Sequence, residues 1–91
     1  MKKQICILGS TGSIGTQALD VVREHSDLFE IYCLTANNRV EQLARQAREF
    51  RPAAVVIAND AHYDRLKELL SDLPEIKVYA GRDALDQIVE A

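Results

Sequence analysis

Several features are scarce in this 91-residue sequence, and each shortage narrows the class of protein. It has only four glycines and two prolines, and 27% of its residues are charged, as in an ordinary globular chain. No apolar run approaches the length of a membrane span, and residues 5–8 are too few for a signal-peptide core. Basic residues are outnumbered 11 to 14 and lie among acidic ones. We therefore expect one small cytoplasmic domain with no nucleic-acid partner and no membrane partner.

Cysteine is also rare, and neither thiol indicates a reactive site. Cys6 and Cys33 both lie in apolar, strand-like runs. This predicts buried free thiols in a reducing compartment rather than a disulfide or a metal pair. The two histidines, His25 and His62, lie in polar segments and are predicted to be surface residues.

Apolar periodicity divides the chain into alternating strands and helices. Four short apolar runs are predicted strands, at residues 4–8, 29–34, 53–58 and 76–79. The first is predicted to be fully buried because its apolar residues are continuous. Each run is followed by a segment of helical periodicity, beginning near residues 13, 38, 60 and 83. The order βαβαβαβα predicts an α/β fold with a parallel sheet and right-handed crossovers.

Capping residues and apolar stripes predict the ends and the buried faces of these helices. Asn38, with Glu41 three residues later, resembles a capping box for the second helix. Pro52 ends that helix, and Asn59 or Asp60 is predicted to cap the third. The predicted core faces are Ile14, Ala18, Leu19, Val21 and Val22; Val40, Leu43, Ala44, Ala47 and Phe50; Leu66, Leu69, Leu70 and Leu73; and Ala84, Leu85, Ile88 and Val89.

The most informative stretch, Gly9-Ser-Thr-Gly-Ser-Ile-Gly15, joins the first predicted strand to the first helix. Gly9 lets the strand turn sharply, Gly12 lets a ligand approach the backbone, and Gly15 lets the helix pack closely. The free amides and the positive end of the helix dipole favour a phosphate. The spacing is G-x-x-G-x-x-G rather than G-x-G-x-x-G, but its position matches a dinucleotide fingerprint. We therefore predict a Rossmann-like, doubly wound sheet that holds a dinucleotide phosphate on this loop.

The end of the second predicted strand indicates which dinucleotide is bound. NAD-binding folds place an acidic residue about twenty positions after the glycines, where it bonds the ribose hydroxyls. Residues 35–39 contain no carboxylate, but they contain two asparagines and Arg39. A guanidinium binds a 2′-phosphate that a carboxylate would repel, so the sequence favours NADP(H). The alternative is that Arg39 is only a solvated residue in the first helical turn.

Four segments of the chain strongly resemble the 1-deoxy-D-xylulose-5-phosphate reductoisomerase family. They are Ile-Leu-Gly-Ser-Thr-Gly-Ser-Ile-Gly-Thr-Gln at residues 7–17, Leu-Thr-Ala-Asn at 34–37, Ala-Arg-Glu-Phe-Arg-Pro at 47–52 and Ala-Val-Val-Ile-Ala at 54–58. The resemblance covers essentially the whole chain. It implies an oxidoreductase that uses NADPH and a divalent metal, Mg²⁺ or Mn²⁺, in non-mevalonate isoprenoid biosynthesis. Its substrate would be 1-deoxy-D-xylulose 5-phosphate and its product 2-C-methyl-D-erythritol 4-phosphate.

The resemblance also implies which residues of this chain contact the cofactor. Residues 11–14 would contact its phosphates and ribose, and residues 37–39 would hold the adenosine 2′-phosphate. Relatives often have the basic residue one place before Arg39, so either Arg39 reaches back to the phosphate or Asn38 takes its place. The full set of expected cofactor-binding residues is Gly9, Ser10, Thr11, Gly12, Ser13, Ile14, Gly15, Ala36, Asn37, Asn38 and Arg39.

The family's enzymes are several hundred residues long, so residues 1–91 would form only part of the NADPH-binding domain. The catalytic and carboxy-terminal domains would be absent, and the metal and substrate ligands would lie beyond Ala91. We therefore assign no catalytic residue and no metal site to this chain, and we expect it to have no reductoisomerase activity alone. Residual NADPH binding would be weak because half of the crevice is missing.

The family pattern also suggests the strand order 4-3-2-1 and a homodimeric parent enzyme. In that order residues 4–8 form an exposed apolar edge strand, which invites self-association. The order 3-2-1-4 would instead cover this strand. Two other functions stay open on the sequence: part of another NADP enzyme, such as a semialdehyde dehydrogenase, and a non-catalytic nucleotide-binding module.

Overall fold

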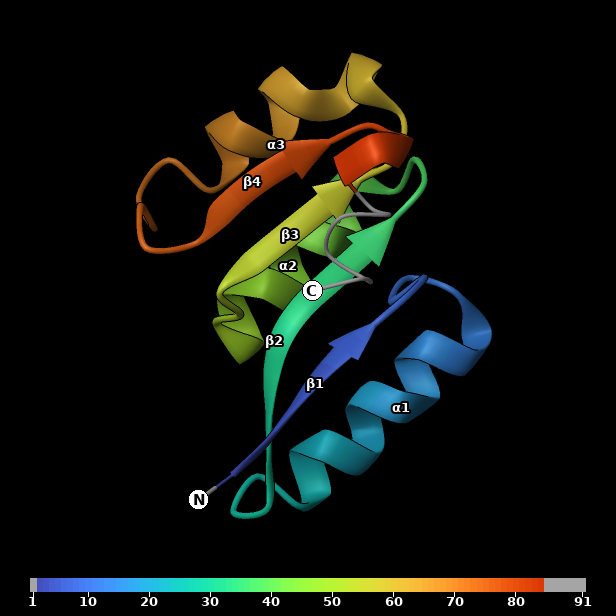
Figure 1. Ribbon diagram of the computed structural model, residues 1–91, viewed down its shortest axis with the longest axis vertical. Helices are drawn as coiled ribbons and strands as arrows, with labels where there is room; N and C mark the ends of the chain where they lie inside the picture. Colours follow the sequence, from blue (N-terminus) through green and yellow to red (C-terminus); the bar gives the residue numbers. More distant parts are fainter. Residues whose placement is uncertain (1, 85–91) are drawn as a thin grey trace.

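A computed structural model describes residues 2–84 as a sheet of parallel strands with helices between them (Figure 1). The elements in chain order are β1 (Lys3–Ile7), α1 (Ser13–Glu24), β2 (Phe29–Ala36), α2 (Val40–Phe50), β3 (Ala54–Ile57), the 3-10 helix η1 (Asp60–His62), α3 (Tyr63–Leu69) and β4 (Lys77–Ala80). These bounds confirm the predicted alternation. Residues 82–84 are helical, and the rest of the predicted fourth helix lies outside the described residues.

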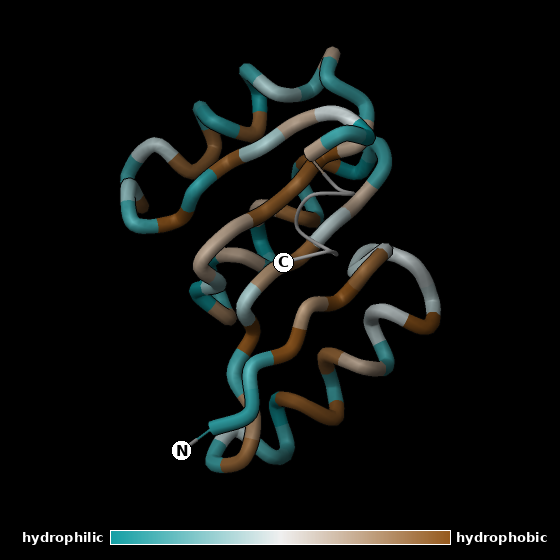
Figure 2. The backbone as a smooth tube through the Cα atoms, in the orientation of Figure 1, coloured by the Kyte–Doolittle hydropathy of each residue, from teal (hydrophilic) through white to brown (hydrophobic). Residues whose placement is uncertain are grey.

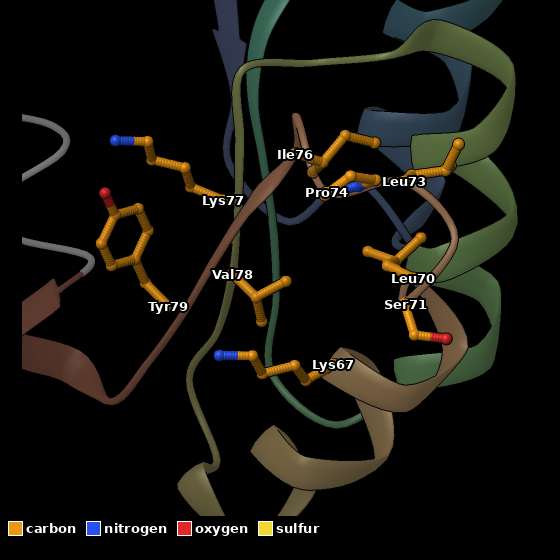
Figure 3. A pocket seen from close by; sticks show the side chains of 9 residues that line it. All are labelled: Lys67, Leu70, Ser71, Leu73, Pro74, Ile76, Lys77, Val78 and Tyr79. Atoms are coloured by element: carbon orange, nitrogen blue, oxygen red, sulfur yellow. The ribbon is translucent and has the colours of Figure 1, made fainter.

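The sheet has the order β1-β2-β3-β4, and all three strand pairs are parallel. This is the predicted 4-3-2-1 order, and the alternative 3-2-1-4 is wrong. Because right-handed crossovers that step in one direction return on the same side, they place their helices on one face. Figures 1 and 3 show α1, α2 and α3 on the same side of the strands. The described chain thus supplies one of the two helical layers of a doubly wound fold.

One hydrophobic cluster joins this helical layer to the sheet. β3 is buried along its whole length, and it forms a brown, apolar stretch in Figure 2. The helices contribute from one stripe each, as amphipathic helices do. The buried members from the helices and the loops that follow them are Leu19, Val22, Val40, Leu43, Ala44, Ala47, Leu66, Leu70, Leu73 and Ile76. No helix within residues 2–84 is long and apolar enough to cross a membrane.

The prediction that residues 4–8 form a fully buried strand is wrong. β1 pairs only with β2 among the described strands, and of its five residues Ile7 alone is buried, with Ile5 half-buried and the others exposed. Cys6 is exposed, which corrects the prediction for that thiol, whereas Cys33 is buried as expected. Burial raises the pKa of the Cys33 thiol, so this side chain stays protonated at neutral pH. A register shift between Ile5 and Cys6 marks an extra residue in β2 at this point.

Two details of the predicted helices are also wrong. On α1, Ile14 is 83% exposed and Val21 is 52% exposed, so the buried stripe is narrower than the run of apolar residues. Asn38 does not cap α2, because the N-cap is Arg39 and no side chain caps that end. α2 ends as predicted before Pro52, and Asn59 caps the following turn by accepting from the Ala61 N–H.

Candidate functional site

The glycine loop leaves the carboxyl end of β1 and returns at once into α1. Gly9 adopts a left-handed conformation, with φ at 68°, which favours glycine at this turn. Its N–H donates to the Thr35 hydroxyl at 2.9 Å, and its carbonyl accepts from the Gly12 N–H at 3.0 Å. The loop is therefore fixed to β2 at its start and closed on itself.

Gly15 and Gly12 have different surroundings, which fit the different tasks predicted for them. A Cβ on Gly15 would lie 2.2 Å from the Gly9 carbonyl oxygen and 2.7 Å from the Ser10 Cα, so α1 packs directly on the loop. A Cβ on Gly12 would lie 3.4 Å from the same oxygen. Gly12 is exposed, so it leaves the outer side of the loop open to a ligand.

Ser10 supports the loop from inside instead of lying on its surface. It is fully buried, and its hydroxyl donates to the Gln46 Oε1 atom at 2.7 Å. The Gln46 Nε2 atom donates back to the Ser10 carbonyl at 2.8 Å, and the Ser10 N–H donates to the Thr35 carbonyl at 2.8 Å. Ser10 therefore ties the loop to α2 and β2.

The amino terminus of α1 offers a site for an anion. Gly12 is the N-cap and has no side chain to accept from the first-turn amides, and the first turn carries no acidic residue. Ser13 and Ile14, which begin the helix, are both exposed. First-turn N–H groups have no partner within a helix, and the helix dipole is positive at this end. A phosphate meets these requirements.

The predicted segments at residues 9–15 and 36–39 face one another across a pocket of about 320 Å³. Its described lining residues come from the glycine loop and from the segment after β2: Gly9, Thr11, Gly12, Asn37, Asn38 and Arg39. None of these six carries a carboxylate. Arg39 is exposed and provides a positive charge, whereas Ala36 is buried and its carbonyl accepts from the Ala58 N–H at 2.8 Å. Ala36, like Ser10 and Gly15, therefore positions the pocket without lining it.

Three residues that shape this pocket were not predicted from the sequence. Thr35 and Gln46 hold the glycine loop, and Asn59 holds the segment after β2. The Asn59 Nδ2 atom donates to the Asn38 Oδ1 atom at 2.7 Å. The only signal for these residues is a polar side chain at a strand end or beside an apolar helical stripe, and such side chains are usually solvated.

A larger, mainly apolar pocket lies apart from this site. A pocket of about 510 Å³ lies between the end of α3 and β4 and shares no residue with the glycine loop (Figure 3). Its lining is mainly apolar, and Tyr79 and Lys77 point away from Leu70 and Leu73. Within residues 2–84 no group of three or more His, Cys, Asp or Glu side chains could hold a metal ion.

Comparison with known proteins gives one consistent family. Residues 5–91 match the family model described as 1-deoxy-D-xylulose 5-phosphate reductoisomerase. The chain is 71% identical over 91 residues to the reductoisomerase of Phocaeicola vulgatus, covering all of this chain and 24% of that protein. It thus spans about a quarter of the length of its curated relative.

Solved structures agree with the sequence relatives. The reductoisomerase of Zymomonas mobilis in complex with NADPH superimposes with a TM-score of 0.89 at 36% identity, over 93% of this chain and 22% of that chain. A second reductoisomerase, in complex with NADPH, fosmidomycin and magnesium, gives a TM-score of 0.84 at 32% identity, over 91% and 20%. The match to the family model, the sequence identity to its members and the similarity of the folds agree. The chain belongs to the 1-deoxy-D-xylulose 5-phosphate reductoisomerase family.

Proposed function

We propose that this chain is the amino-terminal part of an NADPH-binding domain and that residues 9–15 and 36–39 form its cofactor site. The observation that carries this proposal is the pocket between the glycine loop and residues 37–39, which combines an open helix terminus with Arg39 and no lining carboxylate. A dinucleotide diphosphate suits the helix terminus. A 2′-phosphate suits the guanidinium, and the lack of a lining carboxylate removes the partner that NAD-specific sites use.

The residues of the site then have distinct tasks. The amides of Ser13 and Ile14, two exposed residues of the first turn of α1, would receive the diphosphate. The Gly12 N–H already donates to the Gly9 carbonyl, and Thr11 lines the same pocket. Arg39, or Asn38 through its amide, would contact the 2′-phosphate. The Asn38 Oδ1 atom already accepts from Asn59, which leaves the amide NH₂ group as the donor.

For the full-length protein we propose reduction and rearrangement of 1-deoxy-D-xylulose 5-phosphate to 2-C-methyl-D-erythritol 4-phosphate. NADPH would supply the hydride, and a divalent metal would bind outside these 91 residues. One relative of similar fold is described in complex with NADPH, fosmidomycin and magnesium, which supports this assignment. We further propose that the full-length protein is a cytoplasmic homodimer, and that residues 1–91 alone have no reductoisomerase activity.

A titration of the full-length protein with NADPH and with NADH tests the cofactor site. We expect the wild type to prefer NADPH. Arg39→Ala should weaken NADPH binding by about tenfold, because a charge-assisted hydrogen bond is lost, and leave NADH binding little changed. Arg45→Ala is the matched control, since Arg45 is exposed on α2 and does not line the pocket. Equal affinity of the wild type for both cofactors would refute the assignment of the 2′-phosphate to this pocket.

A further inference from the structure

A second polar pocket adjoins the proposed cofactor site at the carboxyl ends of the strands. It measures about 300 Å³, and its described lining residues are Asn37, Asn38, Ala58, Asn59 and Arg82. Asn37 and Asn38 line the first pocket as well. The two pockets are therefore neighbours that share the segment after β2, one reaching toward β1 and the other toward β3 and β4.

The backbone after β4 explains why Arg82 lies here. Gly81 has φ at 93°, and its N–H donates to the Ile57 carbonyl at 3.0 Å, at the end of β3. This bond draws the chain over the carboxyl end of β3 as it leaves β4. In Figure 1 the segment that follows β4 begins beside the loop that follows β3. Arg82, the next residue, is exposed and lines the pocket with Asn59.

The charges around Asn37 and Asn38 favour an anion. Arg39 lines the pocket on one side of this segment and Arg82 lines the pocket on the other. No described residue that lines either pocket has a carboxylate, and among the described residues neither arginine forms an ion pair. Between the two arginines, the Asn38 Oδ1 atom accepts from the Asn59 Nδ2 atom at 2.7 Å. This leaves the uncharged Asn38 NH₂ group free to donate.

We propose that Arg82 is a specificity-determining residue that binds the 2′-phosphate of NADPH together with Arg39. The inference rests on the proposed function, because it deepens the same site. A phosphomonoester carries a charge of about −1.5 to −2 at neutral pH, which one guanidinium does not neutralise. A second guanidinium, placed by the turn at Gly81, compensates for the neutral side chain at Asn38. The ligand class recognised is thus a ribose 2′-phosphate, and the discrimination is against the 2′-hydroxyl.

Two small nucleotides isolate the phosphate contact in the full-length protein. Calorimetric titration with adenosine 2′,5′-bisphosphate and with adenosine 5′-monophosphate compares ligands that differ only in the 2′-phosphate. Arg82→Gln should weaken bisphosphate binding by about 5- to 20-fold, since a charge-assisted contact is lost. Binding of the monophosphate should change by less than about twofold. Arg82→Lys should retain most of the affinity, because it keeps the charge.

Arg45→Gln provides the matched control, because it removes one exposed positive charge outside both pockets. The inference is overturned if Arg82→Gln behaves like Arg45→Gln, or if both nucleotides weaken equally. If the wild type still prefers NADPH in that case, the proposed function stands and only the role of Arg82 fails. If the wild type binds neither NADPH nor the bisphosphate, the proposed function fails, and the role of Arg82 with it.

Discussion

At the scale of single residues, Gly15 is the position where the loop tolerates least change. A methyl group there would meet three backbone atoms of Gly9 and Ser10, the nearest at 2.2 Å, and none of them can rotate away. We expect Gly15→Ala to destabilise the protein by about 3 kcal/mol or more, at the upper end of overpacking effects. Urea unfolding followed by circular dichroism measures the change.

Gly12→Ala is the matched comparison, since the same methyl group would lie 3.4 Å from the same carbonyl oxygen. Its φ of −82° suits any residue, so we expect a stability change within about 1 kcal/mol. The variant should nevertheless bind NADPH more weakly, because the new methyl group covers an open part of the loop. If Gly15→Ala were as stable as Gly12→Ala, that result would contradict the close packing of α1 on the loop at Gly15.

Ser10 shows why a motif predicts the place of a site better than the role of each member. The spacing of the glycines located the loop correctly between β1 and α1. It could not show that Ser10 is fully buried, because that depends on Gln46, which lies 36 residues away in α2. Thr35 and Asn59 were missed for the same reason. Their contacts form only when the ends of β1, β2 and β3 meet.

At the scale of elements, local sequence patterns predicted which segments are helices and which are strands. The errors were in the predicted burial of residues, where burial depends on which elements lie next to them. Continuous apolar residues gave β3 correctly, since it lies between two strands and is buried throughout. The same pattern in residues 4–8 gave a wrong burial for β1, because this strand is at an edge of the described sheet. Val21 of α1 is apolar but 52% exposed, and helical periodicity alone did not distinguish it from the buried residues of the same helix.

The contact between α1 and α2 has an ionic component outside the core. Arg23 donates from Nε and Nη2 to the Glu49 carboxylate at 2.5 and 2.8 Å, and its guanidinium lies 5.2 Å from the Phe50 ring centroid. The hydrogen bond from Arg23 lowers the pKa of the Glu49 carboxyl below its ordinary value near 4.5. Both side chains are about half exposed, so the stabilisation is small and sensitive to salt.

The pH dependence of this ion pair follows from the direction of the shift. A carboxylate whose folded pKa is lowered stabilises the fold above its unfolded pKa and loses this effect as pH falls through the folded pKa. We expect Glu49→Gln to be slightly less stable than the wild type at pH 7 in low salt. The difference should shrink below about pH 4.5 and vanish at lower pH. Urea unfolding at pH 7 and pH 3 measures it.

Glu24→Gln is the control for that comparison, because Glu24 is an exposed carboxylate at the end of α1 that forms no ion pair among the described residues. It should show no such convergence with falling pH. A gap between Glu49→Gln and the wild type that is as large at pH 3 as at pH 7 would assign the effect to packing rather than to charge.

At the scale of the whole molecule, α1, α2 and α3 leave one face of the sheet uncovered, and the two edge strands, β1 and β4, each pair with only one described strand. α1, α2 and α3 lie on the same face (Figures 1 and 3). Away from that layer the structure exposes Cys6 on β1, and Leu8, just after β1, is 56% exposed. A parallel strand at an edge presents free backbone groups that pair readily with another chain. These features would promote association of residues 1–91 when they are produced alone.

We therefore expect residues 1–91 to form dimers or larger species at high concentration, as measured by light scattering. Leu8→Lys and Cys6→Lys should shift the population toward monomer, because a charge beside an edge strand opposes pairing. Val21→Lys places the same charge at a 52% exposed apolar position on α1 and should leave the association unchanged. If the wild-type chain were strictly monomeric, or if Val21→Lys were equally effective, β1 would not be the associating edge. If only Leu8→Lys and Cys6→Lys reduce association, the contact lies at β1, because a general effect of added charge would appear equally in Val21→Lys.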